Sequence, residues 1–278
     1  MVEKLDTQLG KHTKYPNGYN PELLQAVPRS LNRAELGCVN SQPFTGSDVW
    51  HAYELSWLNS KGKPLVAIGR FTFAASTSNI IESKSFKLYL NSLNQTRFDS
   101  RQKLNAVLSR DLSRVADGEV MVELISATDN ATLMAQALPG VCIDDLDISV
   151  DDFTLSPEII TSASAEGEAS KTSETLHSHL LKSNCLITNQ PDWASVIVDY
   201  SGRQIDREAL LRYLLSFRMH NEFHEQCVER IYCDILAAYK PEQLSVQALY
   251  TRRGGLDISP FRTSLKGEQA PLRRINRQ

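Results

Sequence analysis

Residues 53–73, YELSWLNSKGKPLVAIGRFTF, contain two extended segments separated by a polar turn. Polar and apolar residues roughly alternate over residues 53–58, and residues 64–73 form a second extended run. Residues 59–63 between them carry Asn, Ser and Gly, which favour turns. This pattern predicts a pair of strands, because alternation with a period of two directs apolar side chains to one face of a sheet.

A regular succession of segments follows this strand pair. Helical patterns cover residues 83–93 and 100–115, and residues 120–125 (VMVELI) are typical of a strand. The second half of the chain repeats the order strand, helix, helix, strand at residues 194–199, 206–217, 222–239 and 244–250. An antiparallel sheet with helices on one face belongs to the α+β class.

The two halves also share residues at a nearly constant spacing. Tyr-Leu-Asn-Ser at 89–92 matches Tyr-Leu-Leu-Ser at 213–216, and Phe98 matches Phe223. We therefore predict a duplicated ββαα-ββ unit; a shared β/α rhythm without common origin is the alternative. The predicted modules are residues 1–150 and 176–278. They are joined by a linker at 151–175, because residues 161–175 (TSASAEGEASKTSET) are small and polar.

Composition indicates a globular protein with its own core. Of 278 residues, 41% are hydrophobic and 23% are charged, and the net charge of −3 does not suggest a general nucleic-acid binder. No run approaches the ~20 apolar residues of a membrane span. No signal peptide is visible, so we expect a soluble, cytoplasmic protein. The five cysteines include no CxxC pair, which argues against a disulfide framework or a zinc ribbon. No GxG occurs, so a Rossmann site is not supported.

Residues 183–193, SNCLITNQPDW, place a cysteine and an aspartate close together in the sequence. Pro191 rules out a continuous helix here, so Cys185 and Asp192 meet only if the segment folds back. A thiolate is a strong nucleophile, and Lys182 could stabilise it. The alternative is that Cys185 is a small buried residue that caps a strand.

Residues 82–89, ESKSFKLY, carry charged side chains at a predicted helix start. Free backbone N–H groups at this position would make an anion site together with Lys84 and Lys87. Glu82 could accept two hydrogen bonds from an amidine-like edge such as that of guanine. The alternative is a capped helix start with solvated lysines.

Residues 220–225, HNEFHE, and 250–257, YTRRGGLD, form a third candidate region. His220 and His224 share a helix face, so a zinc site must be considered. However, Asn221 stands where zinc proteases have a glutamate, and no third ligand is apparent. Two arginines followed by two glycines suit a phosphate, because cationic donors adjoin a backbone that a ligand can approach closely. The alternative is an ordinary basic turn.

As an ordered set, ESKSFKLY, SNCLITNQPDW, FHE and YTRRGGLDI closely resemble the 7-cyano-7-deazaguanine reductases of queuosine biosynthesis, the QueF family. The resemblance covers the chain from about residue 15 to about residue 265, and the arrangement is similar to the family's two-module form. It implies two tandem tunnelling-fold modules, with antiparallel sheets and helix pairs on one face. Because the motifs are split between the halves, it also implies a site completed between modules, across an interface of a homo-oligomer, most simply a dimer.

The resemblance further implies a reaction and its residues. Cys185 would attack the nitrile to give a covalent thioimide, with Asp192 as proton donor. Two NADPH molecules would then reduce it to the aminomethyl product, with no metal expected. The implied substrate-binding residues are Ile81, Glu82, Ser83, His224 and Glu225. The implied NADPH-binding residues are Ser83, Lys84, Arg253 and Gly254.

Two other functions stay open on the residues alone. One is a different tunnelling-fold enzyme that acts on a pterin, such as a cyclohydrolase, since these also hold a purine-like ring with a glutamate. The other is a non-catalytic module that binds purines or RNA. Such a module would not need Cys185 and Asp192 together.

Overall fold

The computed structural model describes residues 18–38, 42–129, 131–166 and 170–278. The chain forms two compact units, and both are discontinuous in sequence. The first unit consists of Met1–Arg29, Trp50–Thr132 and Arg253–Leu256, and the second of Ser30–Val49, Leu133–Arg252 and Asp257–Gln278. The contiguous modules 1–150 and 176–278, which were defined from the sequence repeat, stay a prediction.

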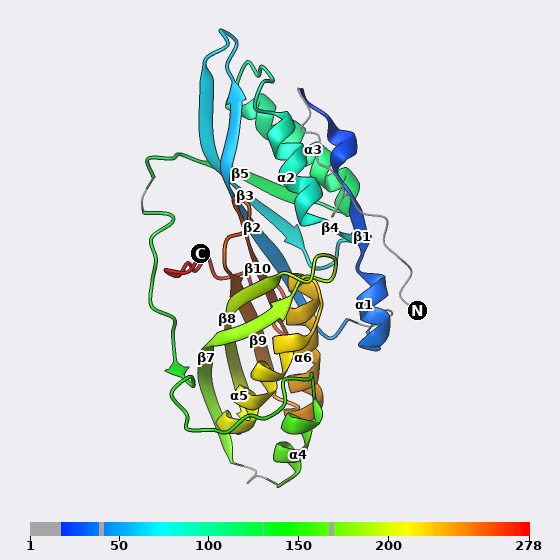
Figure 1. Ribbon diagram of the computed structural model, residues 1–278, viewed down its shortest axis with the longest axis vertical. Helices are drawn as coiled ribbons and strands as arrows, with labels where there is room; N and C mark the ends of the chain where they lie inside the picture. Colours follow the sequence, from blue (N-terminus) through cyan, green and yellow to red (C-terminus); the bar gives the residue numbers. More distant parts are fainter. Residues whose placement is uncertain (1–17, 39–41, 130, 167–169) are drawn as a thin grey trace. The chain divides into compact units, whose positions relative to one another are not determined.

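The first unit contains a long hairpin followed by two helices and a further strand (Figure 1). Its strands are ordered β5-β3-β2, and β3 pairs antiparallel with β5 from Ile68↔Ile125 to Phe73↔Val120. A separate two-stranded sheet joins β1 to β4. The elements, of which β2 begins in the second unit, are a 3-10 helix (Pro21–Leu23), β1 (Ala26–Pro28), β2 (Thr45–Leu58), β3 (Pro64–Ala74), β4 (Asn79–Ile81), α2 (Ser83–Ser92), α3 (Arg101–Ala116) and β5 (Val120–Ile125).

Aromatic side chains hold α2 against the strands of the first unit. Phe86 of α2 is fully buried, with its ring centroid 5.0 Å from that of Phe71 and 5.5 Å from that of Trp50. Burying one such side chain contributes roughly 1.5–3 kcal/mol. The position of α2 is therefore set by its apolar face, and its first turn is fixed with it.

The second unit repeats this order and adds elements of its own (Figure 1). Its strands are ordered β10-β9-β8-β7-β6, all antiparallel except that β6 runs parallel to β7. Its elements are α1 (Ser30–Glu35), β6 (Val141–Cys142), α4 (Glu158–Glu166), β7 (Lys171–Asn184), β8 (Pro191–Arg203), α5 (Arg207–Ser216), a 3-10 helix (Phe217–Met219), α6 (His224–Tyr239), β9 (Gln243–Tyr250) and β10 (Leu256–Thr263).

The predicted repeat is visible in side-chain contacts that occur once in each unit. The Tyr89 hydroxyl donates to Asp111 of α3 over 2.8 Å, and the Tyr213 hydroxyl donates to Asp234 of α6 over 2.5 Å. In both helices a serine three residues after the tyrosine donates to the tyrosine carbonyl, over 2.6 and 2.7 Å. The matching tetrads of the sequence thus make the same contacts in both units.

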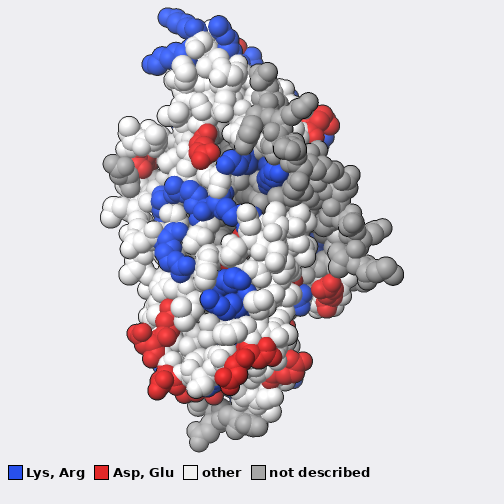
Figure 2. All heavy atoms as spheres, in the orientation of Figure 1, with Lys and Arg blue, Asp and Glu red and all other residues white. Residues whose placement is uncertain are grey.

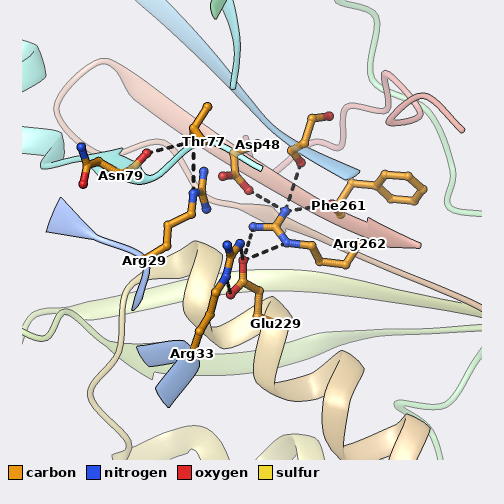
Figure 3. Close-up of polar contacts among 9 residues, drawn as sticks. Arg29, Arg33, Asp48, Thr77, Asn79, Glu229, Phe261 and Arg262 are labelled. Atoms are coloured by element: carbon orange, nitrogen blue, oxygen red, sulfur yellow. Dashed lines mark hydrogen bonds and ion pairs between the residues drawn. The ribbon is translucent and has the colours of Figure 1, made fainter. Parts of the chain in front are cut away.

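A buried ion cluster lies inside the second unit (Figure 3). The Arg262 guanidinium is fully buried and contacts Asp48 over 2.8 Å and Glu229 over 2.9 Å. Arg33 of α1 donates to both carboxylate oxygens of Glu229, at 2.9 and 2.7 Å. Two carboxylates therefore face two guanidinium groups, which offsets part of the cost of removing these charges from water.

The sequence predictions hold for most elements and are wrong for three segments. The α+β class and the predicted helices and strands are confirmed. The linker or exposed loop expected at 151–175 is wrong where the structure describes α4 over 158–166 and the start of β7 at Lys171. Ile160 is fully buried, so a few apolar side chains hold this Ser-rich helix in place. The strand expected from residue 53 begins earlier, at Thr45, and the buried Asp48 interrupts the apolar pattern that would have shown this. The strand β10 was not predicted because Pro260 lies within it.

None of the helices in the described part of the chain is long and apolar enough to cross a membrane. Asp and Glu side chains gather over the end of the second unit that carries α4 (Figure 2). Five aspartates between residues 144 and 152 belong to this unit. This end of the unit is therefore acidic.

Candidate functional site

Cys185 lies in the turn of the β7–β8 hairpin, in the second unit. The antiparallel register brings Asn184 opposite Pro191 and Ser183 opposite Asp192, so the chain folds back as the predicted chemistry requires. The Cys185 amide donates to the Gln190 carbonyl over 2.8 Å, which closes the turn. Cys185 is 7% exposed and Asp192 is 6% exposed. The hairpin therefore carries a thiol in its turn and a carboxyl on the strand that follows, both largely shielded from water.

The segment before α6 holds this turn in place. Asn184 and Asn221 form an isolated parallel bridge, in which the Asn184 amide donates to the His220 carbonyl over 2.8 Å. The Asn221 side chain donates to the carbonyl of Cys185 over 3.3 Å and to Asn189 over 2.9 Å. The segments SNCLITNQPDW and HNEFHE are thus fastened to each other within one unit.

His224 begins α6 and faces Asp192. Its Nε2 atom lies 3.5 Å from a carboxylate oxygen of Asp192, and its ring packs edge-on against Tyr250, with 4.0 Å between centroids. Tyr250 is buried, and this burial raises the pKa of its hydroxyl. The adjacent Glu225 is also buried, at 3% exposed. The imidazole of His224 therefore lies next to the carboxyl that β8 of this hairpin carries.

The two histidines considered for zinc have different partners. His220 Nε2 lies 3.2 Å from Glu222, and Arg230 also binds Glu222 over 2.8 Å. Within the described residues, the one group that meets the geometry of a metal site contains neither His220 nor His224. Their shared helix face, which suggested a site, is absent, because α6 begins only at His224.

Lys182, expected to stabilise a thiolate, makes other contacts. Its ammonium donates to the Asn184 side chain and to the Arg218 carbonyl, both over 2.6 Å. Burial and the nearby Arg218 lower its pKa, while Asp192 opposes this change. Lys182 thus fastens the strand end to the segment after α5.

The other four cysteines are poor candidates for a nucleophile. Burial raises the pKa of Cys38, Cys142, Cys227 and Cys233, in the last case to about 12. A raised pKa keeps a thiol protonated and unreactive at neutral pH. Cys227 is fully buried and Cys233 is half-buried on α6, so both serve packing.

The first unit holds the ESK segment, with Glu82 as the N-cap of α2. Its two carboxylate oxygens accept hydrogen bonds from the amides of Lys84 and Ser85, over 2.9 and 2.7 Å. These amides are therefore not available to an anion, which corrects that part of the sequence prediction. Glu82 is only 1% exposed, and burial raises its pKa, although the two amides and the charges of Lys84 and Arg253 oppose this.

Arg253–Leu256 form a tight turn that also belongs to the first unit. Gly254 and Gly255 have φ angles of +61° and +80°, in a backbone region that residues with a Cβ atom rarely adopt. A Cβ atom on Gly254 would lie 2.9 Å from Nζ of Lys87, and Lys87 is 3.8 Å from Glu54. The turn thus places its backbone beside α2, where Lys84 and Lys87 lie.

The structure therefore sorts the predicted residues into two groups. The first unit contains Ile81, Glu82, Ser83, Lys84, Arg253 and Gly254, and the second contains Cys185, Asp192, His224 and Glu225. Sequence reasoning did not single out Tyr250, which packs on His224, or recognise that Asn221 holds the Cys185 turn. The sequence could have pointed to both, because Asn221 lies in HNEFHE and Tyr250 begins YTRRGGLD.

Comparison with known proteins is consistent with this arrangement. Residues 15–124 match a family model described as the N-terminal part of 7-cyano-7-deazaguanine reductase, a nitrile reductase, and residues 191–269 match one described as QueF-like protein. An NADPH-dependent 7-cyano-7-deazaguanine reductase of Colwellia psychrerythraea (strain 34H / ATCC BAA-681) is 54% identical over 274 residues, covering 97% of this chain and 95% of the relative. The crystal structure of an apo archaeosine synthase QueF-Like is 19% identical, covers 35% of this chain and 95% of its own, and has a TM-score of 0.30, too low to carry an argument.

Two family models match the two ends of the chain, and a relative of more than half identity matches nearly all of it. The resemblance first inferred from four short motifs is thereby confirmed. The chain belongs to the 7-cyano-7-deazaguanine reductase (QueF) family.

Proposed function

We propose that this enzyme reduces the nitrile of 7-cyano-7-deazaguanine to the aminomethyl group of 7-aminomethyl-7-deazaguanine, with NADPH as reductant, in queuosine biosynthesis. The observation that carries the proposal is the β7–β8 hairpin. Its turn holds Cys185, the second residue of β8 is Asp192, and His224 lies 3.5 Å from Asp192. A nucleophile beside an acid–base pair suits addition to a nitrile, whose nitrogen must gain a proton as the carbon is attacked.

In the proposed first step, the sulfur of Cys185 bonds to the nitrile carbon. Asp192 delivers the proton to the nitrile nitrogen, so that thiol plus nitrile becomes a thioimide without loss of atoms. His224, next to Asp192, is placed to return a proton to this carboxyl after transfer. Asp192 is 6% exposed, so little water competes with the nitrile nitrogen for its proton.

Reduction of the thioimide completes the proposed reaction. Bound NADPH supplies a hydride in each of two reductions, and one proton accompanies each hydride. After the first reduction the C–S bond breaks, which frees the Cys185 thiol and leaves an imine. The second reduction converts this imine to the amine, so that two NADPH molecules are oxidised for each product.

For substrate binding we propose Ile81, Glu82 and Ser83 together with His224 and Glu225. Each oxygen of Glu82 accepts one backbone amide, and a carboxylate oxygen has two lone pairs. Both oxygens therefore retain acceptor capacity for the amidine-like edge of the deazaguanine. The position of Glu82, rigidly fixed at the start of a buried helix, favours a recognition role over a flexible one.

For NADPH we propose Ser83, Lys84, Arg253 and Gly254. The cationic side chains of α2 and the adjacent turn fit an anion, and the turn lies so close to Lys87 that a Cβ atom on Gly254 would be 2.9 Å from the Lys87 Nζ. The 2′-phosphate that distinguishes NADPH from NADH needs cationic donors of this kind. A phosphate would be held by these side chains and not by the amides that already bind Glu82.

We further propose a cytoplasmic homodimer in which residues of two subunits serve one active site. The mechanism needs Cys185 as a reduced thiol, and all five cysteines are free. The assembly should have twice the 31.2 kDa mass of one chain in native mass spectrometry. Co-expression of Glu82→Ala and Cys185→Ala chains should restore activity that each variant lacks alone. No restoration would contradict shared sites.

The covalent step gives the direct test of the proposed function. The enzyme incubated with 7-cyano-7-deazaguanine and no NADPH should gain the mass of one substrate molecule per chain in intact-mass spectrometry. Cys185→Ala should gain none, whereas the control Cys233→Ala, which removes a different thiol, should be modified like wild type. Added NADPH should discharge the adduct with two oxidised per product. An adduct on Cys185→Ala, or a ratio of one, would contradict the mechanism.

A further inference from the structure

A second cluster of reactive side chains lies in the second unit, apart from the Cys185 hairpin turn. Cys142, His177 and His179 each offer a ligand atom, and these atoms all lie within 4.8 Å of one another. His179 lies on β7, and Cys185 lies in the turn just after this strand, six residues further on, which at about 3.3 Å per residue separates them by roughly 20 Å. The cluster is therefore distinct from the residues proposed for nitrile reduction.

Backbone pairing brings the cysteine to the histidines. The short strand β6 runs parallel to β7 with Cys142 opposite His177, and the Ile143 amide donates to the His177 carbonyl over 3.0 Å. Gly140, with φ of +80°, allows the approach, since a Cβ atom there would lie only 2.0 Å from the Thr175 carbonyl oxygen. The pairing of β6 with β7 thus holds Cys142 beside His177, although the two residues are far apart in the sequence.

Hydrogen bonds orient both imidazoles for ligation. His177 Nδ1 lies 2.9 Å from the Pro139 carbonyl oxygen, which can only accept, so Nδ1 carries the hydrogen and Nε2 carries the lone pair. His179 Nδ1 lies 2.7 Å from the hydroxyl of buried Ser195, which can accept in the same way. Metal-binding histidines typically donate their second ring nitrogen to such a partner.

The surroundings leave room for a further ligand and supply negative charge. A cavity of about 560 Å³ is lined by residues 135–138, His177, His179 and residues 275–277. Asp144 accepts the His179 amide over 3.0 Å and lies beside Cys142, whereas Arg277 binds the His179 carbonyl over 2.8 Å. Among the described residues, the carboxylate of Asp144 and the guanidinium of Arg277 thus both bind the His179 backbone.

We propose that Cys142, His177 and His179 bind one Zn²⁺ ion, with the fourth position open to this cavity. Zinc favours nitrogen and thiolate ligands in tetrahedral sites, at about 2.0–2.3 Å. Such ligands lie roughly 3.5 Å apart, so side-chain rotation must close the present separations by about 1 Å. The Cys142 thiol loses its proton on binding. The ion fastens the segment 139–143 to β7 and takes no part in nitrile reduction.

Cobalt titration of the full-length protein tests the proposal, because Co²⁺ replaces Zn²⁺ and reports its ligands. We expect one equivalent per chain, with the visible bands of tetrahedral cobalt and a thiolate-to-cobalt charge-transfer band that Zn²⁺ displaces. Cys142→Ser should lose the charge-transfer band, and His179→Ala should weaken binding at least about 10-fold. The matched control Cys185→Ser, which removes the reactive thiol, should retain both signals.

A stability measurement guards against variants that fail to fold. Excess Zn²⁺ should raise Tm of wild type by a few °C through mass action, and it should leave Tm of Cys142→Ser unchanged. Cys142→Ser should also still form the thioimide with substrate, so failure here is distinguishable from failure of the proposed function. A charge-transfer band lost in Cys185→Ser but kept in Cys142→Ser, or no binding to wild type, would overturn the proposal.

Discussion

The hairpins of the two units, β2–β3 and β7–β8, end in turns that are anchored alike and differ in chemistry. Leu58 bridges to Arg97 before α3, just as Asn184 bridges to Asn221 before α6. In the first unit Asn59 follows the bridge, and its side chain accepts the amides of Lys61 and Lys63. In the second unit Cys185 takes this place. The same scaffold thus supports an ordinary surface turn in one unit and a buried thiol, the proposed nucleophile, in the other.

The helix starts that follow the hairpins also differ, but here the buried group lies in the first unit and the exposed one in the second. Glu82 and Asp206 both cap a helix, with nearly equal backbone angles of φ −65°, ψ 125° and φ −65°, ψ 115°. Asp206 is exposed and accepts one amide, whereas Glu82 is buried and accepts two. Capping alone does not require a buried carboxylate. The burial of Glu82 therefore supports the proposal that it recognises substrate, a role that Asp206 is not proposed to have.

The largest effect on the rate of thioimide formation should come from a substitution of Asp192, on the strand that follows the Cys185 turn. Asp192 occupies the second position of β8, where β3 has Leu65. Asp192→Asn keeps the shape but removes the transferable proton, so we expect thioimide formation to slow by ~10²–10⁴-fold. Stopped-flow absorbance of the adduct measures this rate.

Asp199→Asn on the same strand serves as the control for Asp192→Asn. It removes an exposed carboxyl that contacts Thr175 at the far end of the hairpin, so it should leave the rate of adduct formation unchanged. Equal rates for wild type and Asp192→Asn would show that another group donates the proton, with His224 the first to examine.

The paired helix caps give the next largest effect. Glu82→Gln removes a buried charge that accepts hydrogen bonds, and such bonds are worth about 1.5–3 kcal/mol, so KM for 7-cyano-7-deazaguanine should rise roughly 10–150-fold. Asp206→Asn at the equivalent cap should leave KM unchanged and alter stability by less than about 1 kcal/mol. Steady-state kinetics of both variants measure the contrast, and equal KM values would contradict the recognition role of Glu82.

Much of this comparison could be predicted from the sequence. The tetrads at 89–92 and 213–216 indicated the repeat, and the hairpin, helix and strand patterns located its elements. Periodicity succeeded there because the apolar faces are regular. It failed at β10 and at the start of β2, where buried Arg262 and Asp48 neutralise each other across 2.8 Å, a pairing invisible in either segment alone.

The sequence identified most of the candidate residues of the site, but it did not settle the contacts that they make. The motif resemblance supplied Cys185, Asp192, Glu82 and His224 as candidates. The sequence left an anion site and a capped helix start open at Glu82, and the structure shows the cap, because Glu82 accepts the amides of Lys84 and Ser85. Sequence spacing could not show that Cys142 pairs with His177, since the parallel register of β6 and β7 joins residues 35 positions apart.

The basic turn offers a smaller effect on the cofactor. Arg253→Ala should raise KM for NADPH by about 10-fold and reduce the preference for NADPH over NADH, because a charge-assisted contact to a phosphate is lost. The control is its exposed neighbour, Arg252→Ala, which should change neither value. Initial rates with both cofactors test this. An unchanged NADPH to NADH preference in Arg253→Ala would remove it from the proposed phosphate site.

The smallest effect concerns the pH dependence of Glu82, which follows from its burial. Burial raises the pKa of this carboxyl above its ordinary value of 4.5. Just above that pH the folded protein retains a proton that the unfolded chain has lost, so stability should decrease as pH rises through the window that begins near 4.5. Glu82→Gln cannot titrate, so its free energy of unfolding relative to wild type should increase over the same window in urea titrations.

Loss of the Glu82 proton should strengthen substrate binding, although it lowers the stability of the fold. Only the ionised Glu82 can accept two hydrogen bonds from the amidine-like edge, so KM for the deazaguanine should decrease as the carboxyl loses its proton, while stability decreases as well. Glu82→Gln should show neither trend. Parallel urea titrations and KM measurements across this window separate the two outcomes. A wild-type stability that rises through the window would mean that the Lys84 and Ser85 amides, and not burial, dominate at this helix start.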